Sequence, residues 1–139
     1  MVNKNVKDLI DKVALLYIRG KKILSTRSKG KDVWYLPGGK REKNESDKQT
    51  LIREIKEELS VDIIIESLKY MGTFRAQAHG KPEGVFVQMT CYSGDFKGKL
   101  KPAAEIEEIN WFTSGVDKKL LSPVDVIIFA WLKEKDLIK

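Results

Sequence analysis

The sequence lacks the residues and segments that would indicate a secreted or membrane-spanning protein. Cys91 is its single cysteine, so no internal disulfide can form, which favours a reducing compartment. No run of apolar residues is long enough to cross a bilayer, and Met1–Asp11 is polar, without the apolar core of a signal peptide. We therefore expect a cytoplasmic protein with no membrane association. Because Cys91 lies in a largely apolar run, we expect it to be a buried, unreactive thiol.

The sequence also shows no internal repeat, low-complexity segment or linker. Its 139 residues suit one domain, and the apolar fraction of 42% is typical of a packed globular core. We therefore predict a single domain over residues 1–139.

Basic residues exceed acidic ones, with 26 Lys and Arg against 20 Asp and Glu and a formal charge of +6. This excess favours polyanionic ligands such as nucleotide polyphosphates or RNA. Six of the basic residues cluster between Arg19 and Lys31. Two interpretations of this cluster stay open, a phosphate-facing loop and a solvated hairpin.

Strands and helices are predicted from apolar periodicity and from turn residues. We expect strands at Lys12–Ile18, Lys22–Thr26, Val33–Leu36, Val61–Ile65, Lys69–Ala76, Gly84–Tyr92 and Ile109–Phe112. One helix is expected to end near Ser60 and a second to span Pro123–Lys135. This order lacks regular βαβ alternation, so it predicts an α/β (α+β) fold with a mixed sheet and helices on its two faces.

The first of these helices carries three carboxylates on one face, those of Glu54, Glu57 and Glu58. Its apolar positions recur every four residues and are Leu51, Ile55 and Leu59. Like charges at these spacings repel by roughly 0.2–0.5 kcal/mol per pair unless something neutralises them. Hard divalent cations prefer such oxygen ligands. A merely solvated acidic face is the alternative.

Residues 39–61 read GKREKNESDKQTLIREIKEELSV. This segment resembles the Nudix box, G-x5-E-x7-R-E-U-x-E-E-x-G-U, where U is a bulky aliphatic residue. The matching positions are Gly39, Glu45, Arg53, Glu54, Ile55, Glu57, Glu58 and Val61. Ser60 stands where the family usually has glycine, which ends the helix in a left-handed conformation. Serine does so at a cost of about 1 kcal/mol, so we expect a shifted or differently capped helix end, with activity retained.

The resemblance implies a Nudix-type α/β/α sandwich and a MutT-like, Mg²⁺-dependent hydrolase, with Mn²⁺ as an alternative metal. Such an enzyme cleaves a phosphoanhydride bond in a nucleoside diphosphate linked to another moiety, for example a nucleoside triphosphate. The products are a nucleoside monophosphate and pyrophosphate or another phosphorylated fragment. By resemblance, Glu54, Glu57 and Glu58 are the metal ligands, and the Gly39 carbonyl is a further candidate. Arg53 is expected to hold one of these carboxylates, and Glu45 to be structural or an outer ligand.

Substrate contacts are less well defined by the sequence. Family members often use a glutamate before the late strand as a ligand or base; Glu105 is favoured here over Glu107 and Glu108, with a solvated acidic loop as the alternative. Aromatic candidates for stacking on a base are Trp34, Tyr35, Phe74 and Phe86. Arg75 and Gln77 alternate with apolar residues and are candidates for facing the cleft, whereas His79 is expected on the surface.

Several functional alternatives stay open. Within the same chemistry, dinucleoside polyphosphates, nucleotide sugars and RNA 5′ ends are candidate substrates beside small nucleotides. A homodimer is a mild expectation from the family. A different class of function is a non-catalytic Nudix-like module that senses a nucleotide or binds RNA. Retention of all three helix carboxylates argues against that alternative.

Overall fold

The computed structural model describes residues 8–139. Residues 1–7, which belong to the predicted domain and to the polar segment Met1–Asp11, lie outside the described part. The strands are β1 (Asp8–Leu16), β2 (Ile18–Arg19), β3 (Lys22–Ser28), β4 (Gly38–Lys40), β5 (Asp62–Ile63), β6 (Lys69–Gln77), β7 (Val85–Ser93), β8 (Phe96–Lys97) and β9 (Ile106–Phe112). The helices are α1 (Asp47–Leu59) and α2 (Pro123–Glu134), with short 3₁₀ turns at Ile65–Ser67 and Lys118–Leu120. Within the described residues, no helix is both long enough and apolar enough to cross a membrane.

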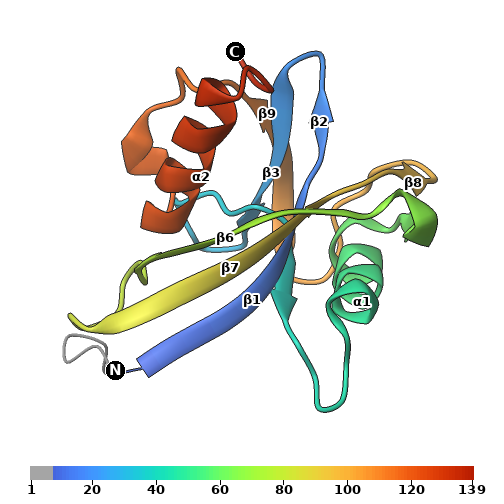
Figure 1. The fold of residues 1–139 in the computed structure, drawn as a ribbon, viewed down its shortest axis with the longest axis horizontal. Helices are drawn as coiled ribbons and strands as arrows, with labels where there is room; N and C mark the ends of the chain where they lie inside the picture. The colour runs from blue at the N-terminus through green and yellow to red at the C-terminus, as the bar shows by residue number, and fades with distance from the viewer. Residues whose placement is uncertain (1–7) are drawn as a thin grey trace.

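The central sheet is mixed, with strand order β4-β1-β7-β6. β1 runs parallel to β7 and antiparallel to β4, and β6 runs antiparallel to β7. A second, antiparallel sheet has the order β2-β3-β9. Helices α1 and α2 lie on opposite sides of the strands (Figure 1). The arrangement confirms the predicted α/β/α sandwich around a mixed sheet.

The second half of β1, Val13–Leu16, is buried on both faces, because successive side chains of a strand point to opposite sides. Val13 and Leu15 belong to the apolar cluster under α1, together with Leu51, Ile55 and Leu59 of that helix. Ala14 and Leu16 belong to the cluster under α2. Each fully buried Leu or Ile contributes about 1.5–3 kcal/mol by leaving water. The position of α1 against the sheet is therefore fixed by its apolar stripe.

Both ends of α1 are capped by serine. Ser46 at the N-cap accepts from the Gln49 N–H, and the Gln49 side chain accepts from the Ser46 N–H, which forms a capping box. At the other end Ser60 is itself left-handed, with φ of 65°, and its N–H donates to the Lys56 carbonyl. The expectation of a shifted or differently capped helix end was therefore wrong, since serine takes the glycine conformation directly. Its hydroxyl donates to the Lys101 carbonyl, which helps to offset the strain (3.0 Å).

Several predicted boundaries differ from the observed ones. The first predicted hairpin is divided, because β1 ends at Leu16 in the central sheet and only β2 pairs with β3. The expected strand Val33–Leu36 is reduced to isolated bridges at Trp34 and Tyr35. The expected strand Val61–Ile65 shortens to Asp62–Ile63, since a 3₁₀ turn begins at Ile65. Cys91 is fully buried, as predicted.

Candidate active site

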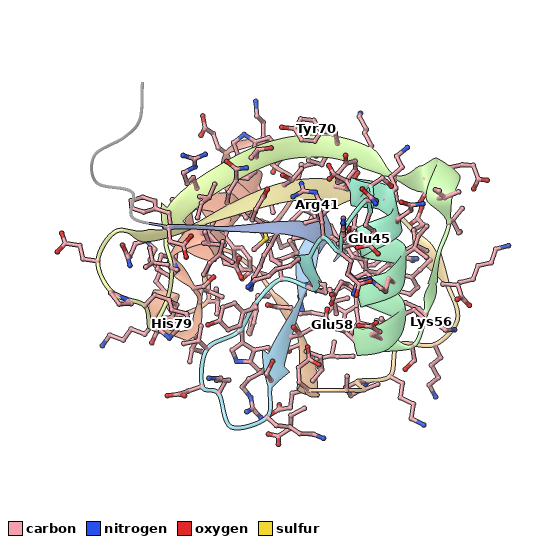
Figure 2. The ribbon with its side chains drawn as sticks, turned by 90° about the horizontal axis from the view of Figure 1, so that it is seen from below. Arg41, Glu45, Lys56, Glu58, Tyr70 and His79 are labelled. Carbon is pink, nitrogen blue, oxygen red and sulfur yellow. The ribbon has the colours of Figure 1, made fainter. Side chains whose placement is uncertain are left out.

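A cavity of about 540 Å³ opens between α1, the β3 end of the second sheet and the loop that joins β6 to β7. Its charged lining residues have both signs and are Glu54, Glu58, Glu105, Lys12, Lys31, Lys40 and Lys81. Tyr35 and His79 also line the cavity, and their rings meet edge to face with centroids 6.5 Å apart. Figure 2 shows Glu58 and His79 on two separate parts of the chain, α1 and the β6–β7 loop. The cavity therefore combines carboxylates, ammonium groups and aromatic surface.

Glu58 is the most buried carboxylate of the cavity, with 7% of its surface exposed. The Gly38 N–H donates to its Oε1 at 3.0 Å. The pKa of Glu58 is raised to about 8, chiefly by burial; the hydrogen bond from Gly38 opposes this shift, and the charges of Glu54 and Glu105 contribute to it. Glu58 therefore holds a proton at neutral pH unless a cation is bound beside it.

Glu54 lies directly against Gly39. A Cβ added at Gly39 would lie 2.4–2.7 Å from the carboxylate atoms of Glu54, so any side chain at position 39 would displace that carboxylate. Burial raises the pKa of Glu54, although its contact with Arg53 opposes the shift. The preceding Gly38 has φ of 146°, and a Cβ there would lie 2.0 Å from the Val13 carbonyl oxygen. The two glycines thus let the β4 backbone approach both β1 and the carboxylate-bearing face of α1.

Arg53 connects the helix to the loop that precedes it. Its Nε and one terminal nitrogen donate to the two carboxylate oxygens of Glu45, each at 2.8 Å, and its other terminal nitrogen donates to Glu54 at 2.7 Å. It also donates to the Lys40 carbonyl at 3.0 Å. The hydrogen bonds from Arg53 lower the pKa of Glu45 to about 2, so Glu45 is ionised at neutral pH. Arg53 therefore orients Glu54 and ties the 40–45 loop to the helix.

The other two carboxylates predicted for the site, Glu105 and Glu57, differ in their access to the cavity. Glu105 lines it, whereas Glu107 and Glu108 both accept hydrogen bonds from Arg27 across the β3–β9 pair. Glu57 does not line the cavity; its side chain is 54% exposed and lies 3.7 Å from Arg53. The structure thus brings Glu54, Glu58 and Glu105 to one cavity, and Glu57 is not among the residues that line it.

Two lysines on neighbouring strands line the cavity and were not predicted as site residues. Lys12 of β1 and Lys40 of β4 are register partners. Burial and the charge of Lys40 lower the pKa of Lys12, although Asp125, Glu58 and Glu54 oppose that shift. No signal in the sequence marks these two lysines, because Lys12 follows Asp11 in the charged first half of its strand and Lys40 lies in the polar segment before α1. Two adjacent ammonium groups in a half-buried cavity form a suitable subsite for an anion.

Asp125 was also missed. It is fully buried at the start of α2, where its Oδ2 accepts from the Leu36 N–H at 3.0 Å. Its Oδ1 and the hydroxyl of Ser122, which lines the cavity, are buried and have no hydrogen-bond partner among residues 8–139. Burial raises the pKa of Asp125 to about 7. The wall of the cavity next to α2 therefore contains unsatisfied polar groups, which are rare in a packed core.

Of the candidate substrate contacts, Tyr35 lines the cavity, whereas Trp34, Phe74, Phe86, Arg75 and Gln77 lie outside its lining. Trp34 is buried in the core, where its ring meets Phe112 edge to face with centroids 5.2 Å apart. Arg75 donates to the Gln88 side chain at 2.6 Å on the exposed side of the β6–β7 pair. The Gln77 amide donates to the Pro82 carbonyl at 2.9 Å, and its oxygen accepts from the Gly84 N–H. These bonds satisfy the side-chain amide of Gln77 within the β6–β7 hairpin.

The carboxylates of the cavity suit a hard divalent cation. Within residues 8–139, no three carboxylate, imidazole or thiol groups are gathered closely enough to form a complete protein ligand set. Mg²⁺ is nevertheless bound in many sites by one or two carboxylates together with substrate phosphates. Glu54 and Glu58 meet that requirement, and a cation beside them would offset the burial that raises the pKa of both groups. Glu54, Glu58 and the Gly39 carbonyl are the cavity groups that would hold the metal, and Glu57 as a further ligand stays a prediction.

Comparison with known proteins identifies relatives across most of the chain. The NUDIX domain model matches residues 9–131. An RNA pyrophosphohydrolase from a Nitratiruptor species is 34% identical over 91 residues, which are 60% of this chain and 55% of that protein. The chain thus spans about half the length of the curated relative that it matches.

Solved structures show the same fold. The E. coli ORF135 protein is 27% identical with a TM-score of 0.70, covering 92% of this chain and 93% of that one. The MutT protein from Methanosarcina mazei Go1 superposes with a TM-score of 0.74 at 21% identity, covering 94% of this chain and 96% of that one. A family model that matches nearly the whole chain, together with a carboxylate-bearing helix behind Gly38 and Gly39, leads to one conclusion: the chain belongs to the Nudix family.

Proposed function

We propose that this protein is a divalent-cation-dependent hydrolase that cleaves a phosphoanhydride bond at the 5′ polyphosphate of a nucleotide. One observation carries the proposal: Glu54, Glu58 and Glu105 line the same cavity as Lys12 and Lys40. Carboxylates suit a hard cation, and the ammonium groups suit the phosphate oxygens that share it. Mg²⁺ is the expected ion, with Mn²⁺ as an alternative. When bound, the metal would neutralise charge on the phosphates and lower the pKa of an attacking water.

The residues of the chain have separable roles in this proposal. Glu54 and Glu58 hold the cation, and Arg53 fixes the orientation of Glu54 through their 2.7 Å contact. Glu105 lines the cavity and is available to accept a proton from water. Lys12 and Lys40 contact phosphate oxygens. No covalent intermediate is needed, because water attacks phosphorus directly and the released phosphate fragment leaves.

The 5′ end of RNA is the substrate form that we favour. The curated relative is named an RNA pyrophosphohydrolase, and the net charge of +6 suits a polyanion longer than a mononucleotide. Lys31 and Lys81, both exposed, line the cavity and are placed to contact further phosphates. The products would be a 5′-monophosphorylated RNA and pyrophosphate or phosphate. The expected homodimer and cytoplasmic location stay predictions.

The test is product analysis on a panel that contains 5′-triphosphorylated RNA, nucleoside triphosphates, a dinucleoside polyphosphate and a nucleotide sugar. Wild type, Glu54→Gln and Glu66→Gln are compared with Mg²⁺ and with a chelator. Glu66 is an exposed glutamate outside the cavity, so it controls for the loss of one negative charge. We expect Mg²⁺-dependent release of pyrophosphate or phosphate from the RNA by wild type and Glu66→Gln only. Binding without hydrolysis of any substrate would support the non-catalytic module instead.

A further inference from the structure

A second, shallower hollow of about 420 Å³ lies away from the active-site cavity and shares no lining residue with it. Three aromatic rings from separate parts of the chain meet there, those of Tyr17, Phe96 and Trp111. The Tyr17 ring centroid lies 4.3 Å from that of Phe96 and 5.8 Å from that of Trp111. Phe96 and Trp111 are half-buried, so part of each ring faces solvent. The hollow therefore presents an accessible aromatic surface.

The hollow is bordered by positive charge. Arg19 and Lys99 line it and are exposed, and the Arg19 guanidinium lies 5.2 Å from the centre of the Tyr17 ring. Lys101, also exposed, follows directly along the chain. No acidic side chain is among the described residues that line the hollow. Partly exposed aromatic rings with cationic neighbours and no carboxylate suit a nucleobase attached to a phosphodiester.

The hollow is connected to the active site by one tightly held segment. From Leu100, which lines the hollow, the chain continues to Glu105, which lines the active-site cavity. The N–H groups of Lys101 and Ala103 donate to the Leu59 and Glu58 carbonyls at 2.9 and 3.0 Å, so this segment follows the end of α1. Five residues extend at most about 18 Å. A single strand of nucleic acid with its 5′ end in the cavity is long enough to reach the hollow.

We propose that this aromatic and cationic hollow binds a base and adjacent phosphate of single-stranded RNA, downstream of the 5′ end that enters the active site. The proposal rests on the proposed function for the identity of RNA as the polymer. The hollow itself shares no lining residue with the cavity that contains the catalytic carboxylates. It explains why Trp111 and Phe96 keep exposed ring surface beside Arg19 and Lys99. It also predicts that a longer RNA binds more tightly than a mononucleotide does.

The experiment measures binding of a short, fluorescently labelled, single-stranded RNA with a 5′-hydroxyl, which contains no bond for the enzyme to cleave. The variants are Arg19→Glu/Lys99→Glu, which reverses the charge, and Trp111→Leu, which removes one stacking surface. Lys133→Glu, an exposed substitution on α2, is the control for added negative charge. We expect Kd to rise about tenfold in the first two variants and to change by less than about twofold in the control.

A second readout separates this hollow from the active site. Hydrolysis of a mononucleotide substrate is expected to keep its kcat and KM in Arg19→Glu/Lys99→Glu, whereas KM for 5′-triphosphorylated RNA rises. Circular dichroism of Trp111→Leu checks that this variant keeps its fold. If it does not, the Arg19→Glu/Lys99→Glu variant, whose substitutions are both at exposed residues, tests the proposal alone. Unchanged RNA affinity in Arg19→Glu/Lys99→Glu, or an equal loss in Lys133→Glu, would overturn the proposal. If the variants lose RNA affinity but wild type hydrolyses no substrate, the result would support RNA binding at the hollow and overturn only the proposed function.

Discussion

Arg53 forms a bidentate contact with Glu45, in which two guanidinium nitrogens donate to the two carboxylate oxygens at 2.8 Å. Lysine keeps the charge but cannot form this fork. We expect Arg53→Lys to lower kcat/KM about a hundredfold, because Glu54 loses its orientation. Steady-state kinetics with the best substrate of the panel measures the effect.

Arg27→Lys is the matched control for Arg53→Lys. Arg27 contacts two carboxylates, those of Glu107 and Glu108, but does not line the cavity. Its replacement should leave kcat/KM within about threefold of wild type. Equal losses in the two variants would show that losing an arginine–carboxylate contact lowers activity wherever that contact lies, and that Arg53 has no particular effect on the site.

Glu58 predicts how metal binding depends on pH. Its pKa of about 8 lies above the ordinary value of 4.5, so the metal-free folded state favours the protonated form, and its stability falls as pH rises through this interval. Mg²⁺ at roughly a hundred times its Kd should stabilise wild type by about 2.7 kcal/mol. The stabilisation should be larger at pH 9 than at pH 6, because less proton release is then required.

Thermal unfolding with Mg²⁺ and with chelator measures this dependence. Glu58→Gln should unfold at the same temperature in both conditions, while Glu66→Gln should respond to the metal as wild type does. A Glu58→Gln variant stabilised by Mg²⁺ as strongly as wild type would remove Glu58 from the proposed ligand set.

Gly39→Ala tests the close approach between β4 and α1. The new Cβ would collide with the Glu54 carboxylate, so we expect kcat/KM to fall about a hundredfold with little loss of helix or sheet content. Gly115→Ala is the control, since its Cβ would meet the Thr113 hydroxyl at an ordinary distance of 3.5 Å. Full activity of Gly39→Ala would mean that the position of Glu54 does not limit the reaction.

Asp125→Asn should change how stability depends on pH. The folded-state pKa of about 7 exceeds the ordinary value of 3.8, so ionisation makes an unfavourable contribution that grows between these values and is complete above pH 7. Asparagine keeps an acceptor for the Leu36 N–H and cannot ionise. We therefore expect the melting temperature of Asp125→Asn, relative to wild type, to rise from pH 4 to pH 7. Exposed Asp95→Asn should show no such trend, and a pH-independent difference at position 125 would contradict the prediction.

The helix and its carboxylate face were predictable because their signals are local. Capping, apolar spacing and charged positions all fall within one short segment, and α1 begins at Asp47 and ends at Leu59 before Ser60. The division of the first hairpin was not predictable, since β1 leaves its neighbour in sequence to pair with β7. No local pattern distinguishes that long-range parallel pairing from a simple hairpin.

The site was predictable only in its acidic half. Glu54 and Glu58 belong to a fixed motif, whereas Lys12 and Asp125 join the cavity region through β1 and α2, which are distant in sequence from that motif. Trp34 shows the opposite error, because an aromatic residue near the motif packs into the core. The spacing of residues along the chain predicts the carboxylate-bearing face of α1. Which other side chains lie beside that face depends on how the strands pair in the folded sheet.

The two-sided burial of β1 also has a consequence for synthesis on the ribosome. β1 emerges well before its parallel partner β7, which ends only at Ser93, and before α2, which begins only at Pro123. Until then only β4 can pair with β1, and the other edge of β1, beside its apolar residues Val13–Leu16, stays unpaired, which is a template for aggregation. The strand that pairs with Gly38 and Gly39 therefore waits for its second partner until β7 is complete. Conditions that slow translation of the second half of the chain should increase its dependence on chaperones.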